Sequence, residues 1–209
     1  MKLIIFGSSG DTGRQLTAQA LELGYVVTAF TRSPEKLDQK HPKLRVIKGD
    51  VLDYSLVEHA IQDQDAVLCA LGMPMMDRSK LRANGTKNII RAMQKTDVRR
   101  FICQSGLGVS DSYDNLPFHY KYFILPFMLR HVYADHELQE SYIKESQLDW
   151  TIVRPAALTD QEHTGTYRHG FAATDKSITV KISRADVADF MLNQLADDTY
   201  LHKTPGVSY

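Results

Sequence analysis

The chain has 209 residues, and its 25 lysines and arginines balance its 25 aspartates and glutamates. Balanced charge without a basic block argues against a nucleic-acid partner, and no apolar run is long enough to span a membrane. No linker, low-complexity tract or internal repeat divides the chain. We therefore expect one domain over residues 1–209 whose partner is a small molecule.

Two further features bear on the compartment. The first residues imitate the start of a signal peptide, but Gly7 ends the apolar run too early and no cleavage site follows, so a cytoplasmic location is expected. Cys69 and Cys103 fall in predicted core strands and lack the spacing of a metal site. We expect both to be buried free thiols, and we expect no metal.

Short apolar runs alternate with amphipathic helical stretches, which is typical of a parallel sheet with helices on both faces. Strands are predicted at residues 2–6, 26–30, 44–48, 66–70, 100–104 and 150–154. Helices are predicted at residues 11–23, 55–61, 80–95 and 133–146. The sequence therefore predicts an α/β fold with a single Rossmann-type, doubly wound parallel sheet and a small elaboration on the substrate side.

A glycine-rich segment, Gly-Ser-Ser-Gly-Asp-Thr-Gly at positions 7–13, joins the first predicted strand to the first predicted helix. Glycines let the backbone approach a pyrophosphate closely, and the N–H groups that open the helix attract the anion. A side chain at Gly7 or Gly10 would occupy the place of the phosphate. The alternative is a tight strand-to-helix turn without a ligand. The predicted cofactor-binding residues of this segment are Gly7, Ser9, Gly10, Asp11, Thr12 and Gly13.

The end of the second predicted strand bears on the choice of dinucleotide. Enzymes selective for NAD place an acidic residue there, whereas this chain has Arg32 and Ser33, with Lys36 nearby. A guanidinium can bind a 2′-phosphate through two hydrogen bonds, and a serine can donate another. NADP(H) is therefore the expected cofactor. The alternative is that Arg32 is an ordinary solvated surface residue.

Two long connections follow the fifth and sixth predicted strands, near residues 105–126 and 156–177. Ligands bind at this edge of an open α/β sheet, and long loops in compact domains are often functional. Residues 164–167 and 177–180 look like the arms of a small hairpin that could form the far wall of the pocket. The first connection is a flap that either covers the core or stacks a substrate, and it carries the aromatic residues Phe118, Tyr120, Tyr122, Phe123 and Phe127.

The chain resembles the atypical short-chain dehydrogenase/reductase group, which is NmrA-like, and within it the flavin reductases, also called biliverdin-IXβ reductases. The matching residues in the first half are Ile5-Phe6-Gly7, Gly10, Thr12-Gly13, Gly24-Tyr25, Val27-Thr28, Arg32, Val46, Gly49-Asp50-Val51-Leu52, Gln64-Asp65-Ala66-Val67 and Asn88-Ile89. Those in the second half are Ser105, Asp135-His136, Glu145-Ser146, Asp160-Gln161, Thr164-Gly165 and Tyr167. These matches span nearly the whole chain.

The resemblance implies a monomer that binds NADP(H) and holds a flat acceptor, such as a flavin or a tetrapyrrole, against the nicotinamide for direct hydride transfer. It implies that Asp50 and Val51 lie beside the adenine and that Leu71 and Gly72 line the nicotinamide ribose. Ser105 corresponds to a serine beside the nicotinamide and the acceptor, and is the candidate catalytic residue.

The family pattern breaks at Ala157, where flavin and biliverdin reductases have a histidine after a proline. The segment Arg154-Pro155-Ala156 instead resembles the wider NmrA-type group. The physiological acceptor is therefore left unassigned, and Phe118 and Tyr122 are the candidate substrate-binding residues.

The sequence offers few candidates for a catalytic acid or base. No tyrosine is followed four residues later by lysine, so the Tyr-x-x-x-Lys pair of ordinary short-chain dehydrogenases is missing in that form. His119, Tyr120 and Lys121 could supply an unusual acid, although a structural role is the simpler expectation. His131 and His136 are expected on a solvated helix face. The motifs of zinc proteases and serine hydrolases are absent.

Two functions remain open from the sequence. The first is an NADPH-dependent oxidoreductase that delivers a hydride to a planar conjugated acceptor and supplies orientation more than acid/base chemistry. The second is a non-catalytic NADP(H) sensor that regulates a partner. The missing Tyr-x-x-x-Lys pair favours the sensor, and the aromatic flap favours the enzyme.

Overall fold

The computed structural model describes residues 1–74, 77–172, 175 and 177–209, apart from the side chain of Pro126. Its main sheet has eight strands in the order β3-β2-β1-β4-β5-β6-β10-β8. These are β1 (Lys2–Phe6), β2 (Val26–Thr31), β3 (Leu44–Lys48), β4 (Ala66–Cys69), β5 (Arg100–Gln104), β6 (Asp149–Pro155), β8 (Arg168–His169) and β10 (Gly206–Ser208). All pairs are parallel except β10 with β8. The expected doubly wound α/β fold is confirmed.

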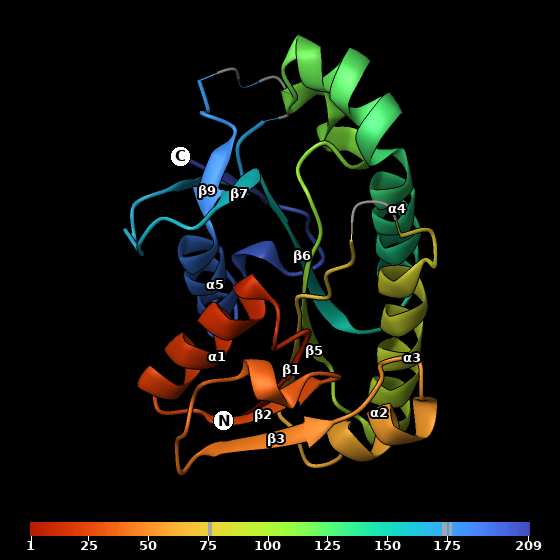
Figure 1. Cartoon of the computed structure of the whole chain (residues 1–209), viewed down its shortest axis with the longest axis vertical. Coiled ribbons are helices and arrows are strands. Elements are labelled where there is room, and N and C mark those ends of the chain that lie inside the picture. Colours follow the sequence, from red (N-terminus) through yellow and green to blue (C-terminus); the bar gives the residue numbers. More distant parts are fainter. Residues whose placement is uncertain (75–76, 173–174, 176) are drawn as a thin grey trace.

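Five α-helices cover the two faces of this sheet: α1 (Asp11–Glu22), α2 (Tyr54–Ile61), α3 (Leu81–Thr96), α4 (Arg130–Lys144) and α5 (Arg184–Asn193). Figure 1 shows α1 and α5 on one side of the sheet and α2, α3 and α4 on the other. Successive side chains of the central strand β1 point to opposite faces of the sheet and pack against the helices on each face. Leu3 and Ile5 pack with α1 and α5, whereas Ile4 and Phe6 pack with α2, α3 and α4.

The order of the strands reverses between β1 and β4. β1 lies between β2 and β4, so the loops that follow β1 and β4 diverge at this point of the sheet edge. Open α/β sheets bind ligands in the crevice that forms at such a switch point. The glycine segment after β1 and Leu71-Gly72 after β4 therefore stand on either side of the expected site.

The two cysteines are buried free thiols, as expected. Cys69 and Cys103 are opposite each other in the register of β4 and β5, and both are fully buried. Among the described residues, no helix combines the length and the apolar character that crossing a membrane requires.

The hairpin expected from residues 164–167 and 177–180 is wrong. The Asp186 carboxylate instead accepts the backbone N–H groups of Thr164 and Gly165, and the Thr179 N–H donates to the Tyr209 carbonyl. Residues 164–167 and 177–180 therefore do not pair with each other as strands. Strands β7 (Ala157–Thr159) and β9 (Lys181–Ser183) pair in parallel as a separate small sheet.

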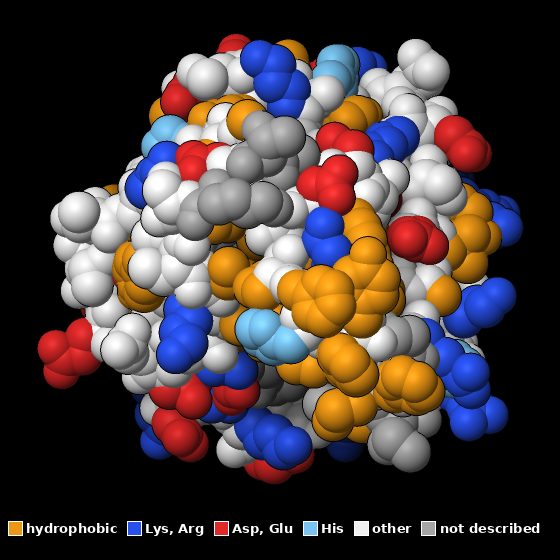
Figure 2. Space-filling view, turned by 90° about the horizontal axis from the view of Figure 1, so that it is seen from above, with side chains coloured by type: hydrophobic (Ala, Val, Ile, Leu, Met, Phe, Trp, Pro, Cys, Tyr) orange, Lys and Arg blue, Asp and Glu red, His pale blue; other side chains and the backbone are white. Residues whose placement is uncertain are grey.

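The long connection after β5 is largely helical. It contains a 3₁₀ helix, η2 (Ser110–Asn115), and a π-helix, η3 (Tyr120–Leu129), which leads directly into α4. Several of its large apolar side chains face outward, including Phe118 at 70% and Phe127 at 80% exposure. Figure 2, seen from above this end of the molecule, shows apolar side chains gathered on this face. These rings are therefore not packed onto the core.

Candidate functional site

The three glycines of the first loop have different physical roles. Gly7 has φ +79°, and a Cβ there would overlap the Ala70 carbonyl at the end of β4. A Cβ at Gly13 would overlap the Gly7 carbonyl. Gly10 is the least crowded of the three, because its Cβ would meet the Gly7 carbonyl oxygen at 3.3 Å, a close contact that a small shift would have to relieve. A side chain at Gly10 would therefore enter the cleft as expected, whereas one at Gly7 would meet the protein backbone instead.

Hydroxyl groups tie this loop to the end of β2. The Thr31 hydroxyl donates to Ser9 Oγ at 2.6 Å, and the Ser33 backbone N–H donates to Thr31 Oγ1 at 3.0 Å. Inside the loop, the buried Ser8 hydroxyl donates to the Phe30 carbonyl at 3.2 Å. The glycine loop and the Arg32-Ser33 segment are thereby held as one rigid rim.

This rim borders a cavity of about 280 Å³. Arg32 is exposed at its edge and has no hydrogen-bond or ion-pair partner in the described part of the chain. Asp50 does not line the cavity, because its carboxylate accepts the Leu52 backbone N–H at 2.9 Å and shapes the turn after β3. The predicted residues that do line it are Gly7, Ser9, Gly10, Arg32, Ser33, Val51, Leu71 and Gly72.

A second cavity, of about 650 Å³, continues from the first along the same edge of the sheet. The two share Gly10, Leu71, Gly72 and Met73 in their walls. Asp11 and Thr12 at the start of α1 border the second cavity, and no side chain caps this helix end. The two cavities form one cleft of the size that cofactors and small substrates occupy, with free helix N–H groups near its middle.

Ser105 lines the larger cavity and is buried. Its hydroxyl donates to Glu140 Oε1 at 2.8 Å. Glu140 also accepts two hydrogen bonds from Arg154, at 2.9 and 2.7 Å, and one from Lys144 at 3.0 Å. The proton of Ser105 is therefore committed to a carboxylate, and its oxygen is left free to accept a hydrogen bond from a ligand.

The charge on Glu140 is held in place. Burial by itself would raise the pKa of this carboxyl, but the hydrogen bonds and charges of Arg154 and Lys144 outweigh it, so the pKa lies below its ordinary value. Arg154 extends the network to Asp111 of η2, at 2.7 Å. The ionised Glu140 therefore remains the acceptor of the Ser105 proton.

His136 is buried, with 8% exposure, and lines the larger cavity, so the solvated face expected for it is wrong. Its Nδ1 lies 3.0 Å from Gln139 Oε1, and the Gln139 amide nitrogen donates to Thr86. Nδ1 therefore carries the hydrogen and Nε2 keeps a free lone pair. Burial, followed by the charge of Arg82, lowers the pKa of His136 to about 4. His131, in contrast, is half-buried and accepts from Arg130 Nε.

The candidates for an unusual acid are separated. Tyr120 lines the larger cavity, whereas Lys121 pairs with Asp114 at 2.7 Å and borders another hollow. Tyr133, which the sequence did not single out, also lines the cavity and donates to the Leu107 carbonyl at 2.7 Å. Burial raises the pKa of Tyr133 to about 12, so it keeps its proton at neutral pH.

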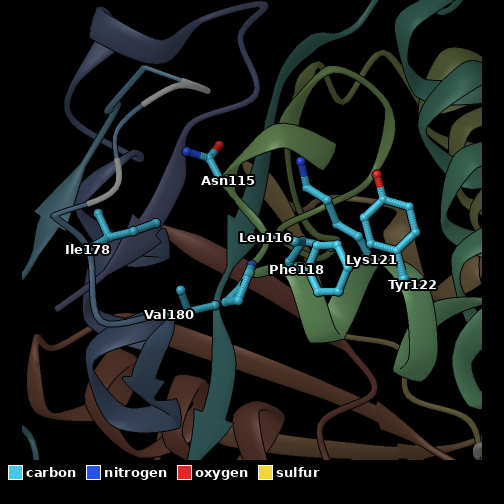
Figure 3. A pocket seen from close by; sticks show the side chains of 8 residues that line it. Asn115, Leu116, Phe118, Lys121, Tyr122, Ile178 and Val180 are labelled. Carbon is cyan, nitrogen blue, oxygen red and sulfur yellow. The ribbon is translucent and has the colours of Figure 1, made fainter.

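Phe118 and Tyr122 are not brought together with Ser105. Their rings pack against each other, 4.6 Å between centroids, beside a separate hollow of about 440 Å³. Figure 3 shows both rings on one side of this hollow and Ile178 on the other. Among the described residues, Leu116 and Val180 are the ones that line both this hollow and the larger cavity.

Sequence reasoning missed the polar side chains that surround Ser105. Arg82 on α3 and Gln104 at the end of β5 line the same cavity as His136. One signal was visible, because Arg154 ends the apolar run of β6 and a charge in a core strand requires a partner. The partner, Glu140, stands on another element, and nothing local in the sequence pairs the two.

A glycine loop, an uncapped helix end and a cleft at the reversal of a parallel sheet define a dinucleotide-binding Rossmann protein. Residues 7–198 match the family described as NAD(P)H-binding, and the chain belongs to that family. The solved structures similar to this chain include one described as a short-chain dehydrogenase/reductase and one described as a putative NAD-dependent epimerase/dehydratase of Bacillus halodurans.

Three relatives are similar to this chain in sequence, and two of them are considerably longer proteins. An uncharacterized chloroplastic protein of Arabidopsis thaliana is 31% identical over 78% of this chain, and the photosystem II assembly factor Ycf39 of Synechocystis is 23% identical over 98% of it. The chain spans 61% of the length of each of these two proteins. A UPF0659 protein of Saccharomyces cerevisiae is 26% identical over 93% of this chain and 87% of its own length.

Solved structures confirm the fold over the whole chain. An oxidoreductase of Lactococcus lactis, ylbE, superposes with a TM-score of 0.84 at 22% identity and covers 100% of this chain and 90% of its own. A short-chain dehydrogenase/reductase of Veillonella parvula, solved in complex with NADP, has a TM-score of 0.81 at 21% identity and covers 100% and 94%.

Proposed function

We propose that this protein is an NADPH-dependent reductase that transfers a hydride to a planar conjugated acceptor of the flavin, quinone or tetrapyrrole type. The observation that carries the proposal is the continuous cleft, which has a phosphate-binding loop at its middle, an unpaired arginine at one end and a buried polar pocket at the other. On the family resemblance we also propose that the protein acts as a monomer, and we propose that it does so in the cytoplasm.

The residues fit NADP(H). The absence of a side chain at Gly10, which lies in the walls of both cavities, and the free N–H groups of α1 suit a pyrophosphate, while Arg32, with Ser33 and Lys36 in the same wall, suits a 2′-phosphate. Leu71 and Gly72 connect this wall to the larger cavity, where the nicotinamide would lie. When bound, the cofactor supplies the hydride.

The larger cavity suits an acceptor that needs no proton from the protein. Ser105 directs its proton to Glu140, His136 is neutral with a bare Nε2, and Tyr133 keeps its proton. An alcohol-forming reduction needs a proton donor beside the hydride, whereas a conjugated acceptor takes its proton from water or its own ring system. The chain's task is then to orient the acceptor against the nicotinamide. We propose that Phe118 and Tyr122 stack an outlying part of the acceptor.

A non-catalytic NADP(H) sensor is the second candidate. The commitment of Ser105 to Glu140 favours it, because the serine hydroxyl then has no proton to give to an acceptor. The same cofactor end of the cleft serves both functions, so only turnover distinguishes them.

Oxidation of NADPH by the purified protein, tested with a flavin, a quinone and a linear tetrapyrrole, separates the two functions. The reductase predicts turnover with at least one acceptor, and a lower rate for Ser105→Ala at nearly unchanged NADPH affinity. Ser141→Ala is the matched control, because Ser141 is a partly buried serine of α4 that does not line the larger cavity. Tight NADPH binding without turnover by any acceptor would favour the sensor.

A further inference from the structure

The larger cavity contains buried polar atoms that the protein itself does not satisfy. Among the described residues, six buried side-chain nitrogen or oxygen atoms have no hydrogen-bond partner. Two of them, Arg82 Nη1 and Gln104 Oε1, belong to residues that line this cavity. Buried polar groups are almost always paired, and leaving one unpaired costs free energy. Both atoms therefore indicate that the cavity holds a polar ligand.

Arg82 is the stronger of the two indications because it is a buried cation. Its side chain is only 9% exposed, and its Nε donates to the Leu71 carbonyl at 3.2 Å. Asp135 lies 3.6 Å from Nη1, beyond hydrogen-bond distance, and its two oxygens accept the backbone N–H groups of Arg82 and Ala83. Asp135 thus forms a long ion pair with Arg82, and Nη1 is enclosed beside it without a hydrogen bond. Nη2 also takes part in no hydrogen bond within the described chain and is not among the enclosed atoms, so it is the nitrogen of Arg82 that a ligand in the cavity can reach.

The other arginine of this cavity shows the contrast. Arg184 donates to Asp160 at 2.6 Å and lies 3.7 Å from Asp11. Its charge is therefore neutralised within the protein at the mouth of the cavity. Arg82 is the one whose free donors stand inside.

The neighbours of Arg82 narrow the ligand chemistry further. His136 offers a neutral Nε2 that takes part in no hydrogen bond within the described chain, and Gln104 offers an amide oxygen. Both suit an N–H or O–H beside the charged group of a ligand. The surrounding wall is largely apolar and suits a flat ring system, with Leu116, Leu129, Val132, Pro155 and Leu158 among its residues.

We infer that Arg82 binds a carboxylate carried by the acceptor, so that the substrate class is a planar conjugated carboxylic acid rather than a neutral quinone. A guanidinium binds a carboxylate through two parallel hydrogen bonds, which satisfies the free donors and neutralises the buried charge in one contact. The inference rests on the proposed function for the identity of the ligand as acceptor, but the anion site itself does not require turnover.

The test uses the full chain saturated with NADP⁺ and two flat probes, 2-naphthoate and its uncharged methyl ester. Titration calorimetry of the wild type is expected to give at least about tenfold tighter binding for the carboxylate, as a charge-assisted contact implies. Arg82→Met removes this preference and leaves ester binding and NADPH affinity nearly unchanged. Arg184→Met, the matched control, keeps the preference because Arg184 is already paired.

Equal affinity of the wild type for the two probes would overturn the inference, and this measurement needs no variant that might fail to fold. A loss of NADPH affinity in Arg82→Met as large as the loss of naphthoate affinity would also overturn it, by assigning Arg82 to the cofactor. If the carboxylate preference depends on Arg82 while no acceptor is turned over, the anion site stands and the reductase proposal fails.

Discussion

At the scale of single residues, the arginines of the cleft differ in how far acidic side chains of the protein pair with them. Arg154 is fully paired by Glu140 and Asp111, and this pairing fixes the direction of the Ser105 hydroxyl. Arg32 is exposed at one end of the cleft and makes no hydrogen bond or ion pair within the described chain, whereas Arg82, at the other end, is ion-paired with Asp135 but keeps donors without a hydrogen bond. Paired arginines position neighbouring groups, whereas unpaired ones are available to a ligand.

Arg32 is expected to determine the cofactor preference. Arg32→Asp should erase or reverse a preference for NADPH over NADH, because an acid repels the 2′-phosphate that the guanidinium binds. A charge-assisted contact is worth about 1.5–3 kcal/mol, so NADPH affinity should fall roughly tenfold to a hundredfold. Fluorescence titration with both cofactors measures this. Arg45→Asp, exposed on β3 away from the cleft, should change neither affinity, and an equal loss for both cofactors in Arg32→Asp would exclude 2′-phosphate recognition.

His136 is expected to make the fold sensitive to mild acid. Its pKa falls from 6.5 to about 4 on folding, chiefly through burial, so the unfolded chain takes up a proton between these values that the folded chain does not. The free energy of unfolding should therefore decrease as the pH falls through this window, by up to about 3 kcal/mol from this group.

Urea unfolding at pH 7 and pH 4.5 measures the effect of His136, with His136→Asn as the comparison. The asparagine amide can replace the Nδ1 donor to Gln139 but does not titrate. The variant should lose less stability between the two pH values than the wild type does. Equal losses would show that His136 does not stay neutral in the folded protein.

At the scale of elements, the β1 loop and α1 were predictable from the sequence because their interactions are local. Gly10 begins the helix without a side-chain cap, and the rim bonds involve residues only 22 positions apart. The hairpin prediction failed because Asp186 on α5 takes its backbone partners. The helix α5 was missed because it is buried on several faces and lacks a clear polar stripe, with buried residues that include Ala185, Val187, Phe190 and Met191.

The glycines of this loop offer a matched pair of substitutions. Gly10→Val should leave a folded protein that does not bind the cofactor, because φ −75° suits valine and the side chain enters the phosphate space. Gly13→Val should instead destabilise the fold, because its Cβ overlaps the Gly7 carbonyl. Thermal melts with and without NADPH measure both effects. A normal NADPH-induced shift in Gly10→Val would contradict the assignment of this loop to the pyrophosphate.

At the scale of the whole molecule, sequence reasoning identified the cofactor end of the cleft better than the acceptor end. The cofactor end is built from loops that directly follow β1, β2 and β4, and each loop carries its own motif. The acceptor end joins α3, β5, α4 and β6, whose polar residues meet only after folding. Family resemblance placed Ser105 there. The roles of Arg82, Gln104 and Glu140 could not be predicted, because they arise from contacts between residues far apart in the chain.

The cleft also predicts how the whole fold responds to its cofactor. Its walls come from both sides of the strand reversal, and the sheet is continuous across it, so a bound dinucleotide should stabilise one cooperative unit. NADPH at a hundred times its Kd should add about 2.7 kcal/mol to the free energy of unfolding. For a chain of this size that corresponds to a rise in Tm of about 5–10 °C. NADH at the same concentration should give a smaller rise. Calorimetry measures both, and two separate transitions, of which NADPH shifts only one, would contradict a single cooperative domain over residues 1–209.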